Sequence, residues 1–544
     1  MWWVLLLGLS LAFYLYVKKK MTLFEKLGIP HQPGTFPFGS NVVWQMFNQK
    51  VSFVKMPDVL CDEFPDAKII GYYGFLGAPT IVVQDFELTK KILIKDFDHF
   101  TIRRSISLHP DTNRYMTKMM TVQEGQDWKN NRHMMSPIFT SGKLKQIMPT
   151  VHECSDDYLK YLHKVDKKDL DVKKLMNLCT CEILGRIGCG VKPDIFKDPE
   201  NNVFYKEMLK LIGEGADKSQ MMRMMMVLYM PTLAYYLKTS FIPPDTTEFF
   251  ADIIRNSTKS RRESGIKQGD FIDFFAEMAK NLEKNNKLEE AEAESEFEKN
   301  AQVKGETPRH MTPEEIDTTV IANGILVFFT GNDTTSTGLA VVLFFLANHQ
   351  DVQEKVYQEI QNAIEENDGR EQLEYNALHS LSYMEKVVKE SFRCWGINFV
   401  ERTCTKEYNI PELNVTIPKG MTVQVAGNKI MHNEKYYPNP SEFNPDLHFE
   451  ATVLVPSTFF SFGQGPRNCI GMRFAWTIMR SFLVRLLANY KVLPGPGLEK
   501  TFTLDPENPA GLPKNGVHVK LEDPEGDDRG VLFVNITETK VKDW

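Results

Sequence analysis

The chain has 544 residues, of which 42% are hydrophobic and 25% are charged, and its formal net charge is −7. These are ordinary values for a globular protein, so they exclude a disordered chain, although the length can hold several average domains. Because no basic block occurs beyond the N-terminus, the charge pattern also argues against nucleic acid as a partner.

The first 17 residues carry no charge and are followed by three lysines, Lys18 to Lys20. Seventeen helical residues span about 26 Å, enough for a thin endoplasmic-reticulum bilayer. A cleaved signal peptide is the alternative, but its positive charge would precede the apolar run. We therefore predict a retained transmembrane anchor over residues 1–17. By the positive-inside rule, the lysines and the catalytic body face the cytosol.

Residues 18–40 are predicted to be a basic, proline-rich hinge. Pro30, Pro33 and Pro37 exclude helix and regular sheet there. The alternating apolar and β-branched residues of 69–83 predict the hairpin of a small sheet.

Helical periodicity dominates from about residue 125 onward. We expect residues 41–522 to form one large domain, because the motifs below must converge on one site, and residues 523–544 to form a polar tail. Residues 221–230 include six methionines. Such a surface is adaptable and suits a pocket or a membrane contact, with the face of a core helix as the alternative.

A capping box at Thr312 to Glu315 predicts a long helix that ends near Asn348. Gly331 and the hydroxyls around it weaken the local backbone ladder, so we expect a kink. Asp333 and Thr334 follow an apolar run, which argues against an exposed polar face. A carboxylate beside a hydroxyl is a pair that can pass protons.

The run from Phe462 to Gly471 places Cys469 in a loop with glycines at 463, 465 and 471, directly before a helix predicted over Met472–Leu487. Glycine adopts backbone angles that other residues avoid, so the loop can fold closely against a flat ligand. A sulfur at a helix start is favoured as thiolate, and Arg467 offers a cation for a carboxylate. A buried structural cysteine is the alternative. The pattern favours an axial haem ligand.

Four segments, in this order along the chain, resemble motifs of the cytochromes P-450, the haem-thiolate monooxygenases. They are Trp128–Arg132, Thr330–Thr335, Glu390–Arg393 and Phe462–Gly471. The resemblance extends from about residue 25 to residue 520. It implies a mainly α fold with small β-sheets, one large domain after one N-terminal transmembrane helix, and haem (iron protoporphyrin IX) as cofactor.

The resemblance also implies roles for individual residues. Cys469 is expected to bind the haem iron, Asp333 and Thr334 to be catalytic, and Glu390 and Arg393 to form a structural pair. The residues expected to bind the cofactor are Trp128, Arg132, Arg402, Phe462, Arg467 and Cys469.

The resemblance implies an enzyme that inserts one oxygen atom from O2 into lipophilic small molecules, either xenobiotics or endogenous lipids. NADPH–cytochrome P-450 reductase supplies the electrons, and cytochrome b5 is a further candidate donor. Lys129, Lys143 and Lys145 are expected to form a basic docking patch, with a solvated face as the alternative.

The segment from Arg132 to Lys143 looks most like the drug- and xenobiotic-metabolising branch of vertebrates and arthropods. The segments expected to line the substrate cavity are Arg103–Met120, Leu211–Ile242, Ile397–Val400 and Asn508–Lys514. The enzyme is expected in the endoplasmic-reticulum membrane, that is, in microsomes.

The sequence departs from the family pattern at three places. Thr330 stands where the family usually has alanine or glycine, and its side chain would narrow or polarise the pocket. Gly396 stands where relatives often have proline before a strand predicted over Ile397–Val400. The family completes the glutamate–arginine pair with an arginine, which the stretch 443–449 lacks, so either His448 substitutes or the third partner is missing.

Two rival functions remain open from the sequence. A haem-thiolate isomerase or dehydratase would need no external electrons, and the Asp333–Thr334 pair argues against it. A non-catalytic haem-binding or sensor protein would need only Cys469 and the residues that hold the propionates.

Overall fold

The computed structural model describes residues 2–104, 106–214, 218–283, 299–303, 311–449, 458–508 and 511–523. The polar tail predicted at 523–544 therefore lies outside the described residues from position 524 onward. Parts of three segments expected to line the substrate cavity, at residues 105, 215–217 and 509–510, lie outside them as well.

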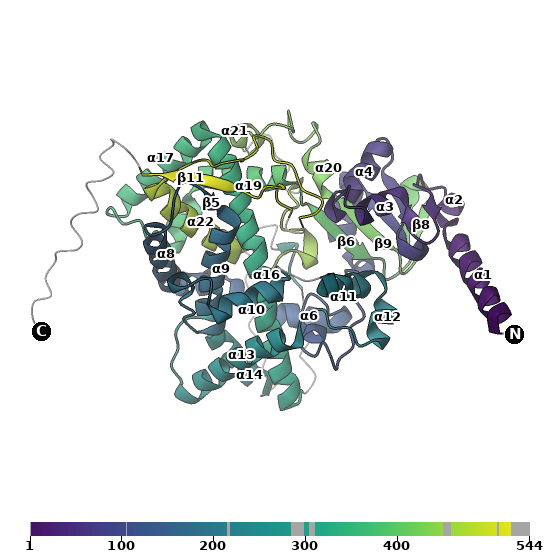
Figure 1. Cartoon of the computed structure of the whole chain (residues 1–544), viewed down its shortest axis with the longest axis horizontal. Helices are drawn as coiled ribbons and strands as arrows, with labels where there is room; N and C mark the ends of the chain where they lie inside the picture. Colours follow the sequence, from purple (N-terminus) through teal and green to yellow (C-terminus); the bar gives the residue numbers. More distant parts are fainter. Residues whose placement is uncertain are drawn as a thin grey trace, which may run out of the picture.

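The centre of the molecule is one long helix, α16 (Pro313–Asn348), around which the other helices are arranged (Figure 1). The predicted capping box is confirmed: the Thr312 hydroxyl accepts from the Glu315 N–H at 3.2 Å, and the Glu315 carboxylate accepts from the Thr312 N–H at 2.9 Å. The kink expected at Gly331 does not interrupt the helix, which runs unbroken to its predicted end.

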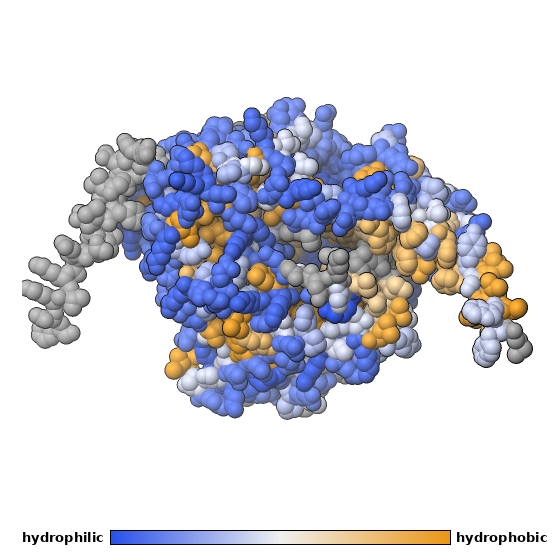
Figure 2. Space-filling view, in the orientation of Figure 1, coloured by the Kyte–Doolittle hydropathy of each residue, from blue (hydrophilic) through white to orange (hydrophobic). Residues whose placement is uncertain are grey.

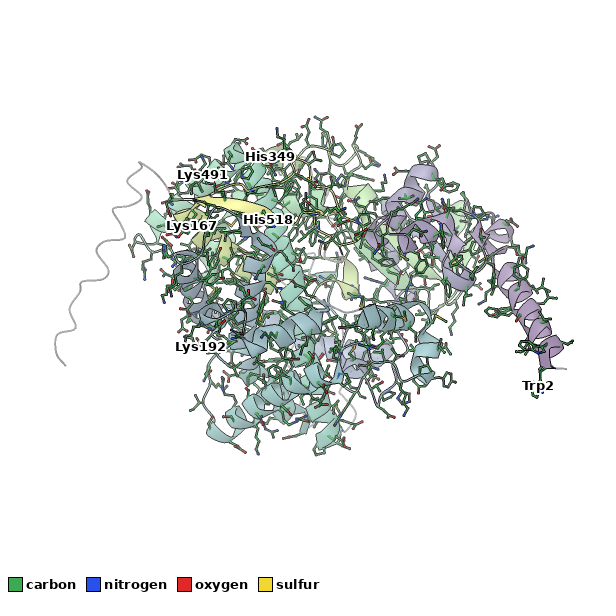
Figure 3. The ribbon with its side chains drawn as sticks, viewed as in Figure 1. Trp2, Lys167, Lys192, His349, Lys491 and His518 are labelled. Carbon is green, nitrogen blue, oxygen red and sulfur yellow. The ribbon has the colours of Figure 1, made fainter. Side chains whose placement is uncertain are left out.

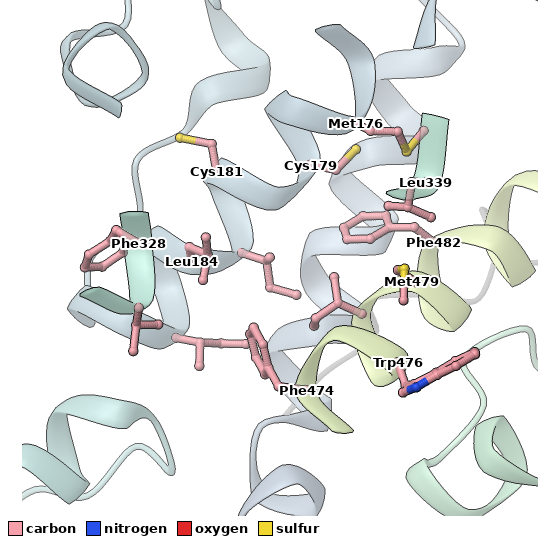
Figure 4. Packing of buried hydrophobic residues seen from close by; sticks show 14 of the residues in the cluster. Met176, Cys179, Cys181, Leu184, Phe328, Leu339, Phe474, Trp476, Met479 and Phe482 are labelled. Atoms are coloured by element: carbon pink, nitrogen blue, oxygen red, sulfur yellow. The ribbon is translucent and has the colours of Figure 1, made fainter. Parts of the chain in front are cut away.

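Helix α9 (Val172–Cys189) packs on α16 more extensively than any other element that the structure describes, and α22 (Met472–Asn489) also contacts it. Glycines let the first of them approach: a Cβ on Gly188 would lie 2.9 Å from the Phe328 ring. Figure 4 shows where the three helices meet, with Leu184 of α9, Phe328 of α16 and Phe482 of α22 in one continuous apolar core. This packing fixes the position of the middle of α16.

The remaining helices of the body pack around this core or in the smaller apolar clusters beside the main sheet. They are α3 (Asn41–Phe47), α4 (Met56–Glu63), α5 (Phe86–Lys90), α6 (Gly125–Met135), α7 (Ser141–Gln146), α8 (Met148–Leu162), α10 (Val203–Ile212), α11 (Lys218–Tyr229), α12 (Pro231–Tyr236), α13 (Pro244–Ser264), α14 (Phe271–Glu283), α17 (Gln350–Glu366), α18 (Tyr375–Ser380), α19 (Ser382–Trp395), α20 (Gly427–Met431) and α21 (Pro445–His448).

The largest sheet has four strands in the order β3-β4-β9-β6, and it lies toward the N-terminal side of the body (Figure 1). Its strands are β3 (Ile69–Tyr73), β4 (Pro79–Val83), β9 (Thr422–Ala426) and β6 (Phe399–Thr403). The predicted hairpin over 69–83 is confirmed, since β3 pairs with β4 antiparallel, while β4 pairs with β9 parallel.

The strand predicted over Ile397–Val400 begins two residues later, as β6, and continues to Thr403. The reason is Gly396, which ends α19 with a left-handed φ of 74°. The chain needs two more residues to leave that turn. Proline, whose φ is fixed near −65°, cannot adopt this conformation.

Smaller sheets complete the fold. They are β1 (Gly34–Thr35) with β2 (Gly39–Ser40), β7 (Tyr408–Ile410) with β8 (Val415–Ile417), and β5 (Leu170–Asp171), β10 (Lys491–Pro494) and β11 (His518–Glu522) in the order β10-β11-β5. The prediction that the proline-rich hinge excludes regular sheet is wrong for β1 and β2, because the chain turns between them and brings two residues on each side into register. The short helix α2 (Leu23–Leu27) also lies within the predicted hinge.

The N-terminal helix α1 (Trp2–Lys20) projects away from the body (Figure 1). Trp2 lies at its far end (Figure 3), and Val17 is the one buried residue of the helix. By length and composition, a span over Trp2–Leu27 can cross a membrane. The helix continues three residues beyond the predicted boundary at residue 17, through the lysines.

Candidate active site

The loop that carries Cys469 is shaped by two of its three glycines. Gly463 and Gly465 have φ values of 68° and 70°, and a Cβ on Gly465 would lie 1.9 Å from the carbonyl oxygen of Leu93. Gly471 has an ordinary φ of −87° and stands as the N-cap of α22, so the conformational argument made for it from sequence is wrong. The predicted helix after the loop is confirmed, extended by two residues to Asn489.

The loop holds Cys469 by its backbone, since the N–H of Cys469 donates to the carbonyl of Phe462 at 2.8 Å. Burial raises the pKa of the Cys469 thiol, while the N–H of Gly471 and the guanidinium groups of Arg132 and Arg103 act in the opposite direction. The stabilisation of thiolate expected from sequence is therefore present but is outweighed by burial. Metal coordination deprotonates a thiol outright, whatever its pKa in the free protein.

Cys469 keeps accessible surface although protein surrounds it, and its neighbours Arg467 and Asn468 are buried. Arg103 shows the same combination of accessible surface and surrounding protein. This combination is typical of side chains that line an internal cavity.

Four arginines are gathered in this region: Arg103, Arg132, Arg402 and Arg467. Burial lowers the pKa of Arg132 to about 10 and that of Arg467 to about 9, and repulsion from neighbouring arginines adds to the effect. The pKa of Arg402 is lowered well below its usual value for the same two reasons. Among the described residues, none of the four forms an ion pair with a carboxylate. Such a cluster calls for an anionic ligand, because buried like charges repel one another.

The arginines are oriented by backbone and aromatic contacts. Arg132 donates to the backbone and side-chain oxygens of Asn468 at 2.7 and 2.5 Å. Arg467 donates to the carbonyls of residues 101 and 123, both at 2.9 Å, and its guanidinium lies 4.0 Å from the centre of the Trp128 ring. The Nε of Arg402 is buried without a hydrogen-bond partner. Of the four arginines, only Arg103 was not singled out from the sequence, although the segment assigned to the cavity lining begins with it.

The accessible face of α16 is marked by two threonines one turn apart, Thr330 and Thr334. Between Ile316 and Ala347 these are the exposed residues of the helix. Their hydroxyls donate to backbone carbonyls, Thr330 to Leu326 at 2.8 Å and Thr334 to Thr330 at 2.6 Å. Two accessible hydroxyls in the middle of a buried helix indicate that it borders a cavity there.

Asp333 does not lie free beside Thr334. Its Oδ1 accepts from Nζ of Lys173, on α9, at 2.6 Å. No pattern in the sequence indicates this partner, because Lys173 and Lys174 look like an ordinary solvated pair at the start of a helix.

Glu390 and Arg393 form a fully buried ion pair, with Nε to Oε2 at 2.7 Å and Nη2 to Oε1 at 2.8 Å. His448 completes the group: its Nδ1 lies 2.8 Å from Glu390 Oε1. The sequence left open whether His448 replaces the arginine as third partner of this pair or the partner is missing, and in the structure the third partner is His448. Despite burial, hydrogen bonds from Arg393 and His448 hold the pKa of Glu390 at about 2.

Comparison with known proteins agrees with this arrangement. Residues 67–521 match the family described as Cytochrome P450.

The chain belongs to the cytochrome P450 family.

Relatives come from insects and mammals. The cockroach Blattella germanica protein named Cytochrome P450 9e2 is 30% identical over 86% of this chain and 88% of its own length. The Lithocholate 6-beta-hydroxylase of the hamster Mesocricetus auratus is 29% identical over 93% of this chain and 95% of its own. Cytochrome P450 6B7 of the moth Helicoverpa armigera is 27% identical over 95% of this chain and 98% of its own length.

As a cytochrome P450, the protein is a haem-thiolate monooxygenase that takes electrons from a redox partner and acts on lipophilic molecules. The residues present fit the haem. An accessible thiol stands in a loop shaped by glycines. Beside it lies a cluster of guanidinium groups that have no carboxylate partner among the described residues, which matches an anionic, planar group. The apolar N-terminal helix is consistent with membrane association.

Proposed function

We propose that this cytochrome P450 inserts one oxygen atom from O2 into lipophilic xenobiotics or endogenous lipids at the endoplasmic-reticulum membrane. The observation that carries the chemistry is the accessible Cys469 beside Arg103 and three buried arginines, none of which pairs with a carboxylate among the described residues. The names of the relatives, among them a lithocholate hydroxylase, support a lipophilic substrate.

In this proposal Cys469 binds the haem iron. Trp128, Arg132, Arg402 and Arg467, joined by Arg103, meet the propionates, and Phe462 packs in the cysteine loop with its ring 5.9 Å from that of Phe392. When bound, the haem supplies the redox-active iron at which dioxygen is activated. The buried arginines orient the cofactor and neutralise its carboxylates, which charged hydrogen bonds do well in a dry site.

Thr334 and Asp333 are proposed to deliver the protons that oxygen activation consumes. The Thr334 hydroxyl is accessible and donates its hydrogen to the Thr330 carbonyl, so its lone pairs can accept a proton, and it can pass a proton on when the hydroxyl turns away from that carbonyl. Thr330 also uses its hydroxyl as a backbone donor, which favours narrowing of the pocket over polarising it.

The proposed electron donor is NADPH–cytochrome P-450 reductase, with cytochrome b5 as a further donor. Lys129 lies on α6, and Lys143 and Lys145 lie on α7. Among the described residues, none of these three lysines is paired with a carboxylate. Unpaired surface cations can attract an acidic protein and speed its association.

The proposed organisation has a membrane anchor over residues 1–17, a hinge over 18–40 and a catalytic domain over 41–522 on the cytosolic side. Apolar side chains gather along α1 and around α12, on the same side of the body (Figure 2). Leu233, Tyr236 and Leu237 are exposed there. Such a surface beside the anchor supports contact of the body with lipid.

The first test is the difference spectrum of the reduced protein with and without carbon monoxide. We expect a strongly red-shifted Soret band, which requires thiolate opposite the gas, and its loss in Cys469→Ser. A band typical of histidine-ligated haem in the unaltered protein would contradict the assignment. Reductase-dependent NADPH consumption then separates a monooxygenase from an isomerase or a sensor.

The proton-delivery role is tested with Thr334→Ala. We expect less product per NADPH oxidised and more hydrogen peroxide, with an unchanged carbon monoxide spectrum. Fully coupled turnover in this variant would remove Thr334 from the mechanism.

A further inference from the structure

Lys173 reaches the central helix from the side of α9 and contacts three residues on one face of α16. Its Nζ lies 2.6 Å from Asp333 Oδ1 and 2.7 Å from both Ser336 Oγ and Thr337 Oγ1. A lysine ammonium has three N–H donors, so these contacts engage all of them. The lysine side chain is 13% exposed, and the structure describes no other cation within ion-pair distance of Asp333.

The same face of α9 also forms hydrogen bonds with Asn332, the residue before Asp333. Asn332 is fully buried, donates to Asn177 Oδ1 at 2.5 Å and accepts from the Thr180 hydroxyl at 2.6 Å. Gly331 also faces α9, since a Cβ there would be in van der Waals contact with Leu184 at 3.4 Å. The stretch 331–337 of α16 is therefore held by α9.

The contact with Lys173 distinguishes the two oxygens of the Asp333 carboxylate. Oδ1 is bound by the ammonium, whereas Oδ2 accepts no hydrogen bond from any residue that the structure describes. Oδ2 is thus the oxygen left to exchange protons with water. Without the lysine, the side chain would rotate, and this distinction would be lost.

We propose that Lys173 is a positioning residue for proton delivery, a role that rests on the proposed function of Asp333 and Thr334. Lys173 anchors Asp333 Oδ1 to α9 and so presents Oδ2 at a fixed place. A proton taken up there from solvent passes through water toward the Thr334 hydroxyl, while the ammonium keeps its own three protons. Fixed geometry matters because a displacement of about 1 Å can cost roughly 100-fold in rate.

The test compares Lys173→Met with Lys174→Met. Lys174 is the matched control, because it pairs on the surface with Glu200, at 54% and 76% exposure. In the reductase-supported holoenzyme we expect Lys173→Met to lower product per NADPH oxidised roughly tenfold, and to increase hydrogen peroxide and the solvent deuterium isotope effect. Lys174→Met should match the unaltered enzyme, and Lys173→Arg should recover part of the coupling.

A purely structural role makes a different prediction. Lys173→Met would then lower the melting temperature or haem retention but leave coupling and the isotope effect unchanged, and that result overturns the proposal. If Asp333→Asn uncouples the enzyme and Lys173→Met does not, only the role of Lys173 fails. If neither variant uncouples it, the proposed function of Asp333 fails as well.

A second readout needs no turnover. Acylation of the folded protein, followed by peptide mass spectrometry, should modify Lys173 at least tenfold more slowly than Lys174, because the Lys173 side chain is only 13% exposed and its ammonium donates to three partners. Asp333→Asn should raise the rate at Lys173 and leave Lys174 unchanged. Equal acylation rates for both lysines in the unaltered protein would contradict the proposed anchoring of Asp333 by Lys173.

Discussion

At the scale of single residues, His448 determines how a buried carboxylate is accommodated. Its Nδ1 faces Glu390 and its Nε2 lies 2.5 Å from the carbonyl of Pro438, so both ring nitrogens face acceptors. The ring of His448 therefore bridges the carboxylate and the backbone, in the place where the family pattern has an arginine.

We expect His448→Leu to destabilise the protein by about 1.5–3 kcal/mol, since Glu390 keeps its pair with Arg393 but loses a buried hydrogen bond to its charged carboxylate. Urea unfolding at neutral pH measures the loss. His518→Leu is the control, because His518 pairs with Asp169 at the surface and its removal should cost about 1 kcal/mol or less. Equal effects of the two changes would contradict the role of His448.

Glu390 makes the free energy of unfolding depend on pH in the acidic range. Its folded pKa of about 2 lies below the ordinary value of 4.5. A depressed carboxyl pKa contributes stability that is fully present above 4.5 and is lost as pH falls toward 2. We expect this contribution to be about 3 kcal/mol. The unfolding free energy between pH 6 and pH 3 should therefore fall less in Glu390→Gln than in the unaltered protein, and parallel pH profiles would contradict the prediction.

At the scale of elements, the cysteine loop depends on close approach between segments that are distant in sequence. Gly465 has a left-handed φ, and its Cα faces the carbonyl of Leu93. Gly463 has nearly the same φ, but a Cβ there would meet only the Cα of Asn468 at 3.6 Å. Substituting each glycine in turn therefore separates the energetic cost of backbone strain, present at both positions, from the cost of a clash with Leu93, present only at Gly465.

We expect Gly465→Ala to lose most bound haem and its red-shifted carbon monoxide band, because the loop cannot close over Leu93. Gly463→Ala carries only the strain of a non-glycine residue at positive φ, roughly 1–2 kcal/mol, and should retain haem. Haem content per protein measures both variants. Similar haem contents in the two variants would show that the clash with Leu93 does not determine whether the loop can hold haem.

At the scale of the whole molecule, we propose that α1 and the apolar surface around α12 form two membrane contacts of different strength. An apolar helix that spans the bilayer is inserted almost irreversibly, whereas a surface patch binds reversibly. The protein should therefore remain associated with membranes in two separable ways.

We expect deletion of residues 2–20 to convert an alkali-resistant membrane protein into one that alkaline carbonate releases. The truncated protein should still bind lipid vesicles, and Leu233→Ser with Tyr236→Ser should abolish that binding. Val203→Ser, which changes an exposed apolar residue on α10, is the control. Vesicle binding unaffected by the double change would place the lipid contact elsewhere.

The sequence alone was sufficient for features that depend on neighbours along the chain. The capping box at Thr312, the hairpin over 69–83 and the helix after the cysteine loop depend on local hydrogen bonds, turn residues and periodicity. The family and its cofactor were also predictable, because the four motifs keep a fixed order.

Only the tertiary structure decided which side chains meet across long separations. Lys173 is 160 positions from Asp333, and His448 is 58 from Glu390. Arg103 joins the other arginines only because its segment folds against the cysteine loop, where its guanidinium contacts the backbone of Arg467. Such pairs follow from the packing of whole helices and loops, and the pattern of a single segment does not encode them.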